Sequence, residues 1–238
     1  MMRFRFAGAV LALLLAAPAG LASAQDMERM IVTANRVDAS TMRSAPAVYR
    51  RIPADFVLVA VTFQSATRDE GERQKELETM FKRLKTKAAQ TDGIDLSGGR
   101  LGSSTSDIET VLFTDIYAND YNGAGRFTLT LSVDTREGES FENLVARAED
   151  FVMTIKVEGR AEAYLGDEQF IGARDVTKHR SDLMADIANE VAGLRETFGA
   201  AGTKVTLTGL ENRIITQPSG PLELEIFIPY TSVLETSG

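Results

Sequence analysis

The sequence predicts an α+β fold, in which a mixed, mostly antiparallel sheet carries about three helices on one face. Three observations support this class. Short runs rich in Val, Ile, Leu and Thr recur along the chain and are typical of strands. Three longer segments place apolar residues at helical spacing. The strands occur in neighbouring groups rather than in strict alternation with helices, which favours α+β over a parallel α/β sheet.

The first 24 residues have the features of a secretory signal peptide. Arg3 and Arg5 form a basic start, an apolar run covers 7–17, and residues 22–24 (ASA) are a cleavage motif of the A-x-A type. The apolar run is too short to span a bilayer. We therefore expect a mature chain that begins near Gln25, lies in the periplasm and has no transmembrane helix. We expect residues 25–238 to form one domain, with 25–50 and 216–238 at its periphery.

Residues 53–89 form the strongest strand-then-helix unit. A short strand over 30–37 and a polar loop over 38–47 precede it. The run from Phe56 to Phe63 is apolar on both faces, which predicts a central strand. Asp69 is a predicted N-cap for the helix that follows. One helical stripe is predicted to be buried: Leu77, Met80, Phe81, Leu84 and Ala88.

Gly and Ser dominate residues 95–106 (DLSGGRLGSSTS), which predicts a flexible loop. The glycines there lack the Lys and the strand–helix setting of a phosphate-binding loop. Residues 109–117 and 127–133 follow as predicted strands. Asn122 and Gly123 between them are a hairpin signal, so we expect these two strands to pair with each other.

The last hundred residues predict two more helices among strands. Ser140 is a predicted N-cap for a helix whose stripe is Phe141, Leu144, Val145, Ala148 and Val152. A strand over 160–171 with a bend at Gly166 comes next, then a helix from about 173 to 199. Predicted strands over 203–215 and 222–228, joined by a turn over 217–221, close the chain.

Composition excludes several classes of function. The net charge is -8, and loss of Arg3 and Arg5 with the signal peptide makes it more negative by two. This acidity disfavours nucleic acid and anionic membrane surfaces as partners. The chain has no Cys, which excludes disulfides, thiolate metal sites and a Cys nucleophile. His179 is the only histidine, so a Ser-His-Asp triad would have to use it as its base.

Acidic residues on the third predicted helix are the first candidate for chemistry. Asp182 and Asp186 lie at i and i+4, and Asp175 and His179 share their face. Such a group can hold a divalent cation or a general base. Because basic residues are interleaved with them, we interpret them as a solvated helix face.

Other polar groups give no stronger signal. We interpret Glu70, Glu72 and Glu76, with Arg73 and Lys75, as i,i+4 surface pairs. The set Asp115, Asp120 and Asp134 lacks the spacing of a calcium loop. We interpret Tyr117 and Tyr121 as caps of the sheet, with a partner surface as the alternative. The sequence therefore assigns no catalytic, cofactor-binding or metal-binding residue, and no cofactor.

The order of elements resembles a known family. A short strand over 30–37 follows the predicted signal peptide. The segment 53–55 (PAD) then leads into the Val-rich strand 57–61 (VLVAV) and a long helix. A hairpin whose second strand resembles 127–134 comes next, and a long charged helix over 173–201, which ends in Ala-Gly and is followed by a strand, completes the pattern. Over roughly residues 30–215 this order is similar to the SIMPL domain (DUF541) family of bacterial envelope proteins.

The chain departs from that family in two places, and the resemblance implies little chemistry. The first helix is rich in Lys and Glu rather than Ala, and the loop after Asn35 is longer. The resemblance implies a periplasmic or outer-envelope location, a link to stress responses and, by analogy with one relative, a large ring-shaped or channel-like oligomer. It supplies no catalytic motif to transfer.

Together these inferences predict a non-enzymatic periplasmic protein that acts by self-assembly or by binding an envelope protein. Two alternatives stay open. A hydrolase in the same compartment would need His179 or a carboxylate cluster in a pocket. A carrier would hold a small apolar ligand between the sheet and the helices.

Overall fold

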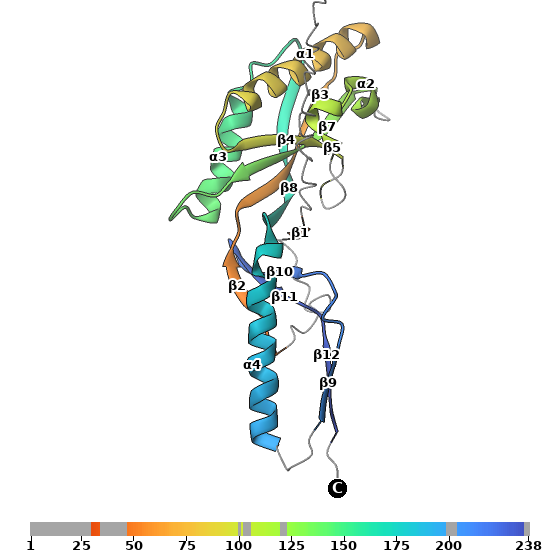
Figure 1. The fold of residues 1–238 in the computed structure, drawn as a ribbon. Coiled ribbons are helices and arrows are strands. Elements are labelled where there is room, and N and C mark those ends of the chain that lie inside the picture. The colour runs from red at the N-terminus through yellow and green to blue at the C-terminus, as the bar shows by residue number, and fades with distance from the viewer. Residues whose placement is uncertain are drawn as a thin grey trace, which may run out of the picture.

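The computed structural model describes residues 30–33, 47–99, 101, 106–119, 123–198 and 204–235, the first of these ranges by its backbone alone. The predicted signal peptide, the cleavage motif and most of the predicted loop at 38–47 lie outside these ranges. The predicted α+β class is confirmed. Figure 1 shows a sheet with helices α1 and α3 at one end, from which helix α4 and a narrow strand arm extend.

The main sheet is antiparallel throughout and has β3 near its centre, as predicted. Its strand order is β1-β8-β3-β7-β4-β5, and β6 also pairs with β7. The strands are β1 (Met30–Thr33), β3 (Phe56–Ser65), β4 (Ile94–Gly98), β5 (Ser106–Asp107), β6 (Ala118–Asn119), β7 (Gly125–Asp134) and β8 (Ala161–Ala173).

Helices α1 (Glu70–Ala89) and α3 (Phe141–Met153) cover one face of this sheet and bury its core (Figure 1). All five residues of the predicted α1 stripe are buried. In the core the rings of Phe63 and Phe127 stack with centroids 5.1 Å apart, and Phe81 meets Phe127 edge-on at 5.9 Å. Each such buried side chain stabilises the fold by about 1.5–3 kcal/mol.

Both predicted helix caps are confirmed. The carboxylate of Asp69 accepts a hydrogen bond from the backbone N–H of Glu72 at 2.8 Å, and the hydroxyl of Ser140 accepts one from the N–H of Asn143 at 3.2 Å. Each satisfies a backbone donor that a helix start leaves unpaired.

The predicted strand over 109–117 is wrong. This segment forms a 3₁₀ turn, η1 (Ile108–Thr110), and a short helix, α2 (Phe113–Ile116). Phe113 and Tyr117 lie one helical turn apart, and the ring of Phe113 packs on Phe81 and Phe127. Contact with this aromatic cluster favours the helical spacing over an extended one.

The predicted hairpin partner of β7 is also wrong. β7 pairs along its length with β3 and, toward its end, with β4, and only the two-residue β6 joins its first residues. Strand β4 occupies the start of the segment predicted to be a loop, because Ile94 and Leu96 bury their side chains in the core. The alternation of apolar and polar residues in β4 is short, and the glycines that follow it favour the interpretation as a loop.

The third predicted helix begins later than expected. β8 continues to Ala173, and Asp175 has a left-handed φ of 51° that separates the strand from η2 (Val176–His179) and α4 (Arg180–Phe198). The predicted bend in β8 is a shift in its register with β3, where the pairs change from Val59–Gln169 to Val61–Leu165.

The C-terminal strands also differ from the prediction. The segment over 203–215 is divided between β9 (Lys204–Thr208) and β10 (Ile215–Gly220), so the predicted turn over 217–221 lies mostly within a strand. β11 (Glu223–Phe227) confirms the predicted closing strand, and β12 (Thr231–Glu235) follows it. A second sheet has the order β10-β11-β2, where β2 is Arg50–Pro53, and β9 pairs with β12.

Two parts of the chain lie elsewhere than predicted, although the fold class is as expected. α4 does not lie beside α1 and α3 but extends from the main sheet past β2 (Figure 1). The segment over 216–238, expected at the periphery, contributes Leu224, Ile226 and Ile228 to the buried core.

Candidate functional site

The acidic pair on the third helix has a basic partner that sequence reasoning missed. The guanidinium of Arg50, on β2, contacts Asp186 through Nε–Oδ2 at 2.5 Å and NH2–Oδ1 at 3.1 Å, and Asp182 at 2.9 Å. The hydrogen bond from Arg50 holds the pKa of Asp186 below its usual value. These carboxylates therefore join β2 to α4. A separation of 136 residues between Arg50 and Asp186 leaves no local signal for this contact.

The other acidic candidates are not brought together. Asp134, at the end of β7, pairs with Arg174 at 2.6 Å, whereas Asp115 lies exposed on α2 and leads into β6 at the opposite end of β7. A strand of ten residues separates those ends by about 30 Å. Asp120 lies outside the described residues. Within the described ranges, no group of three His, Asp or Glu side chains is placed to hold a metal ion.

The prediction of simple surface pairs on α1 is wrong for two residues. Glu76 accepts hydrogen bonds from the hydroxyls of Ser65 at 2.5 Å and Thr67 at 2.9 Å. Arg73 is buried and donates to the carbonyl of Thr67 at 2.8 Å. Both side chains therefore tie the helix start to the end of β3.

Tyr117 behaves as a cap of the sheet. Its ring packs against Phe113 with centroids 5.4 Å apart, and its hydroxyl donates to Asn119 at 2.8 Å. Tyr121 lies outside the described residues.

The feature that stands out instead is one long hairpin at the end of the chain, which we call the C-terminal hairpin (204–235). Its near half consists of β10 and β11, which pair with each other, and β11 also pairs with β2. Its far half consists of β9 and β12, which we call the ribbon. In Figure 1 the ribbon extends away from the main sheet, as α4 does. Among the described strands, β9 and β12 pair only with each other.

A bend separates the two halves of the hairpin. Gly209 has φ of 89°, a conformation that favours glycine, and Asn212 donates from Nδ2 to the carbonyl of Pro229 at 2.7 Å. Arg180, the first residue of α4, donates to the carbonyls of Leu210 and of Asn212, the latter at 2.9 Å. The start of α4 therefore holds the bend in place.

The ribbon is exposed and has edges suited to strand pairing. Every residue of β12 is exposed, including Val233 at 49% and Leu234 at 39%. The only charged residues of the ribbon, Lys204 and Glu235, pair across its end at 3.4 Å. Monomeric proteins usually protect such edges with central charges, prolines or bulges, and none occurs within β9 or β12.

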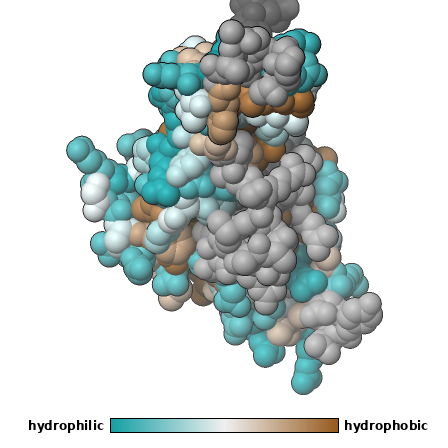
Figure 2. Space-filling model, turned by 90° about the horizontal axis from the view of Figure 1, so that it is seen from below, coloured by the Kyte–Doolittle hydropathy of each residue, from teal (hydrophilic) through white to brown (hydrophobic). Residues whose placement is uncertain are grey.

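Most residues of helix α4 are also exposed to solvent. It is about 28 Å long, and Leu183 and Ile187 are its buried residues. Burial and the carboxylate of Glu190 raise the pKa of the Tyr230 hydroxyl. Seen from below, the protein surface shows hydrophobic residues between polar ones in several places (Figure 2).

Within the described residues, no helix is long and apolar enough to cross a bilayer. A scan of the chain against models of known protein families gave no match, and a search of curated proteins gave no similar sequence.

Proposed function

We propose that the protein is a non-enzymatic component of the bacterial cell envelope that acts by self-assembly, with the ribbon as its contact surface. The observation that carries this proposal is the exposed ribbon itself. An isolated two-stranded hairpin is marginally stable in water, and it gains stability when a third strand or an apolar layer joins it.

The occupant we propose is the ribbon of a second copy. When β12 pairs antiparallel with its own copy about Val233, Thr231 faces Glu235 and Ser232 faces Leu234 across the new edge. No carboxylate then lies opposite another carboxylate, and apolar side chains meet at the centre. The same residues serve both copies, as a two-fold interface requires.

The proposed location rests on the sequence alone. The signal-peptide features of residues 1–24 support export to the periplasm. The resemblance of the sequence over residues 30–215 is the support for relationship to the SIMPL domain family, and with it for an oligomeric envelope role in stress responses.

Light scattering behind a sizing column tests the assembly. We expect the protein to elute with a mass of at least two chains, and Val233→Lys to reduce this to one chain. Two lysines would then face each other at the centre of the paired edge and repel. Leu112→Lys is the matched control, because Leu112 is 61% exposed on the main-sheet half of the molecule and should leave the mass unchanged.

A single-chain mass for the unaltered protein over a wide range of concentration would contradict the proposal. Equal loss of mass in both variants would show that assembly does not use the ribbon.

A further inference from the structure

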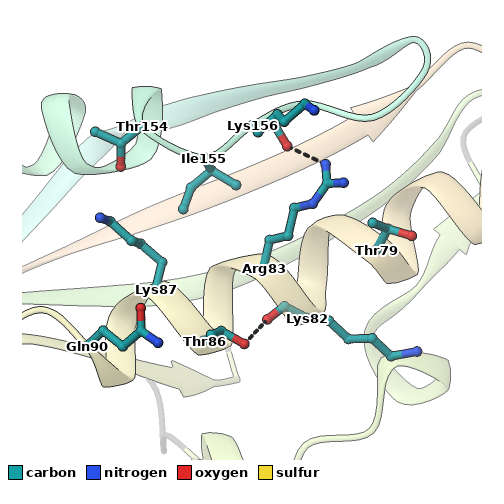
Figure 3. Close-up of a pocket in the computed structure, with 9 residues that line it drawn as sticks. All are labelled: Thr79, Lys82, Arg83, Thr86, Lys87, Gln90, Thr154, Ile155 and Lys156. Carbon is teal, nitrogen blue, oxygen red and sulfur yellow. Dashed lines mark hydrogen bonds between the residues drawn. The ribbon is translucent and has the colours of Figure 1, made fainter.

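A groove on the main-sheet half has features of a ligand site. It lies between the second half of α1, from Thr79 to Gln90, and residues 154–156 after α3 (Figure 3). Its volume is about 410 Å³, within the range of small-molecule sites. A second cavity of about 240 Å³ adjoins it and shares Lys87 and Thr154.

The charge of this groove is opposite to that of the whole protein. Of the described residues that line it, none is acidic and four are cationic: Lys82, Arg83, Lys87 and Lys156. The protein as a whole carries a net charge of -8. A local cluster of positive charge in an acidic protein is a feature that an anionic ligand would recognise.

Two of these cations have no carboxylate partner within the described part of the chain. Lys82 pairs with Glu78 at 2.6 Å and Arg83 with Glu158 at 2.6 Å. The ammonium groups of Lys87 and Lys156 make no ion pair with a described residue. The dipole of α1 favours Lys87 in the last helical turn, but Lys156 lies beyond the end of α3, so the dipole does not explain both.

The walls of the groove are joined to each other. Arg83 on α1 donates to the carbonyl of Lys156 at 2.7 Å, as Figure 3 shows, and this bond fixes the segment after α3 against α1. In the same view Lys87 points from α1 toward Thr154 and Ile155. The two unpaired ammonium groups are thus carried by opposite walls that a direct hydrogen bond connects.

The rest of the lining consists of three threonines, Gln90 and one aliphatic residue, Ile155. Ile155 is buried between the walls. The hydroxyls of Thr79, Thr86 and Thr154 already donate to backbone carbonyls of their own helices. Next to the groove, Met153 and Val157 are 79% and 51% exposed. Lysine and arginine stems add further apolar surface below their charged ends.

We propose that this groove binds an amphiphilic organic anion, that is, an aliphatic chain with a phosphate or carboxylate head group. The head group lies beside the ammonium group of Lys87 at the Thr154 end of the groove, within the positive field that Lys156 adds from the other wall, and the chain lies along Ile155. Charge-assisted hydrogen bonds supply the specificity for the head group, and apolar contact supplies that for the chain. The site does not depend on the ribbon, so its test is independent of self-assembly.

The probe we would use is octyl phosphate, titrated into the ¹⁵N-labelled protein. We expect saturable shifts of the amide signals of Gln90, Ile155 and Lys156, and weaker binding at about 1 M salt, where charges are screened beyond about 3 Å. Inorganic phosphate tests the head group alone, and octyl glucoside tests the chain alone. Each should bind more weakly than octyl phosphate.

Charge reversal then locates the site. The double variant Lys87→Glu with Lys156→Glu should weaken binding of octyl phosphate at least about tenfold, because it reverses the two unpaired positive charges of the groove. Lys75→Glu is the matched control on an exposed position of α1 outside the groove, and it should bind as the unaltered protein does. Thermal unfolding of each variant confirms that it is folded.

Three results would overturn the proposal. The first is no saturable shift with octyl phosphate. The second is binding of octyl glucoside or inorganic phosphate as tight as that of octyl phosphate. The third is equal loss of binding in the Lys75 control and the double variant.

Discussion

The two halves of the C-terminal hairpin have the same pairing but opposite surroundings. In β10 and β11 the strands pair antiparallel, and Leu224 and Ile226 are fully buried. In β9 and β12 the pairing continues beyond the bend at Gly209, yet Val233 and Leu234 are exposed. The difference lies in their neighbours: β2 pairs with β11 in the near half, whereas no described strand joins the far half.

This contrast assigns a different role to each half: the near half stabilises the fold, and the far half is free to bind a partner. The near half contributes to the core, so its apolar residues hold the fold together. The far half carries similar apolar residues, but they would stabilise the protein only when a second copy pairs with the ribbon. Substitutions in the two halves should therefore have different consequences, and the following experiments test that difference.

The largest expected difference comes from the same substitution in each half. Leu224→Ala should lower the free energy of unfolding by about 2–5 kcal/mol, because it leaves a cavity in the core. Leu234→Ala should change it by no more than about 0.5 kcal/mol in the single chain. Urea unfolding at low protein concentration measures both. Equal losses would show that the ribbon is as well packed as the near half.

A substitution at the bend should act on the ribbon alone. At Gly209 a Cβ atom would lie 2.8 Å from Nδ2 of Asn212 and 2.9 Å from the Pro229 carbonyl, and φ is 89°. Gly209→Ala should therefore cost about 1–3 kcal/mol in local stability. Amide hydrogen exchange should become faster in β9 and β12 but not in β10 and β11.

Gly193→Ala is the control for this experiment. Gly193 lies within α4 with open space around it, so alanine there should stabilise the helix by about 0.5–1 kcal/mol. Faster exchange in the ribbon of this variant would mean that α4, rather than the bend, controls the ribbon.

The smallest effect concerns the contact that joins α4 to β2. Arg50 lowers the folded-state pKa of Asp186, so this contact stabilises the fold above the pKa of the unfolded state and is lost as pH falls through the folded-state value. Asp186→Asn should be less stable than the unaltered protein at neutral pH, and the difference should vanish as pH falls through the lowered pKa of Asp186, because both side chains are then neutral. Urea midpoints measured across this range give the comparison.

Asp182→Asn provides the reference, because Asp182 is the more exposed partner of Arg50 and its loss should change stability less. A stability difference that is independent of pH in the Asp186 variant would contradict an ionic origin.

Local patterns predicted the elements that bury a regular stripe. The central strand β3, helix α1 with its Asp69 cap and helix α3 with its Ser140 cap follow from apolar spacing and capping residues within a few positions of each other. The same reasoning failed for α2, since a four-residue helix has too few positions to show a period and takes its shape from contact with Phe81 and Phe127.

The candidate sites were less accessible to sequence reasoning. The ion pairs of Asp182 and Asp186 required Arg50, and the groove required Lys156 to lie against α1. In both cases residues far apart in the chain meet only after folding.

Sequence by itself determined the fold class, the central strand and the two helices that cover it, because apolar periodicity and helix caps act between near neighbours. Tertiary structure alone decided which strands pair, where α4 lies and which half of the C-terminal hairpin is buried. Those outcomes depend on side chains and strand edges brought together from distant parts of the chain, where no local pattern records the partner.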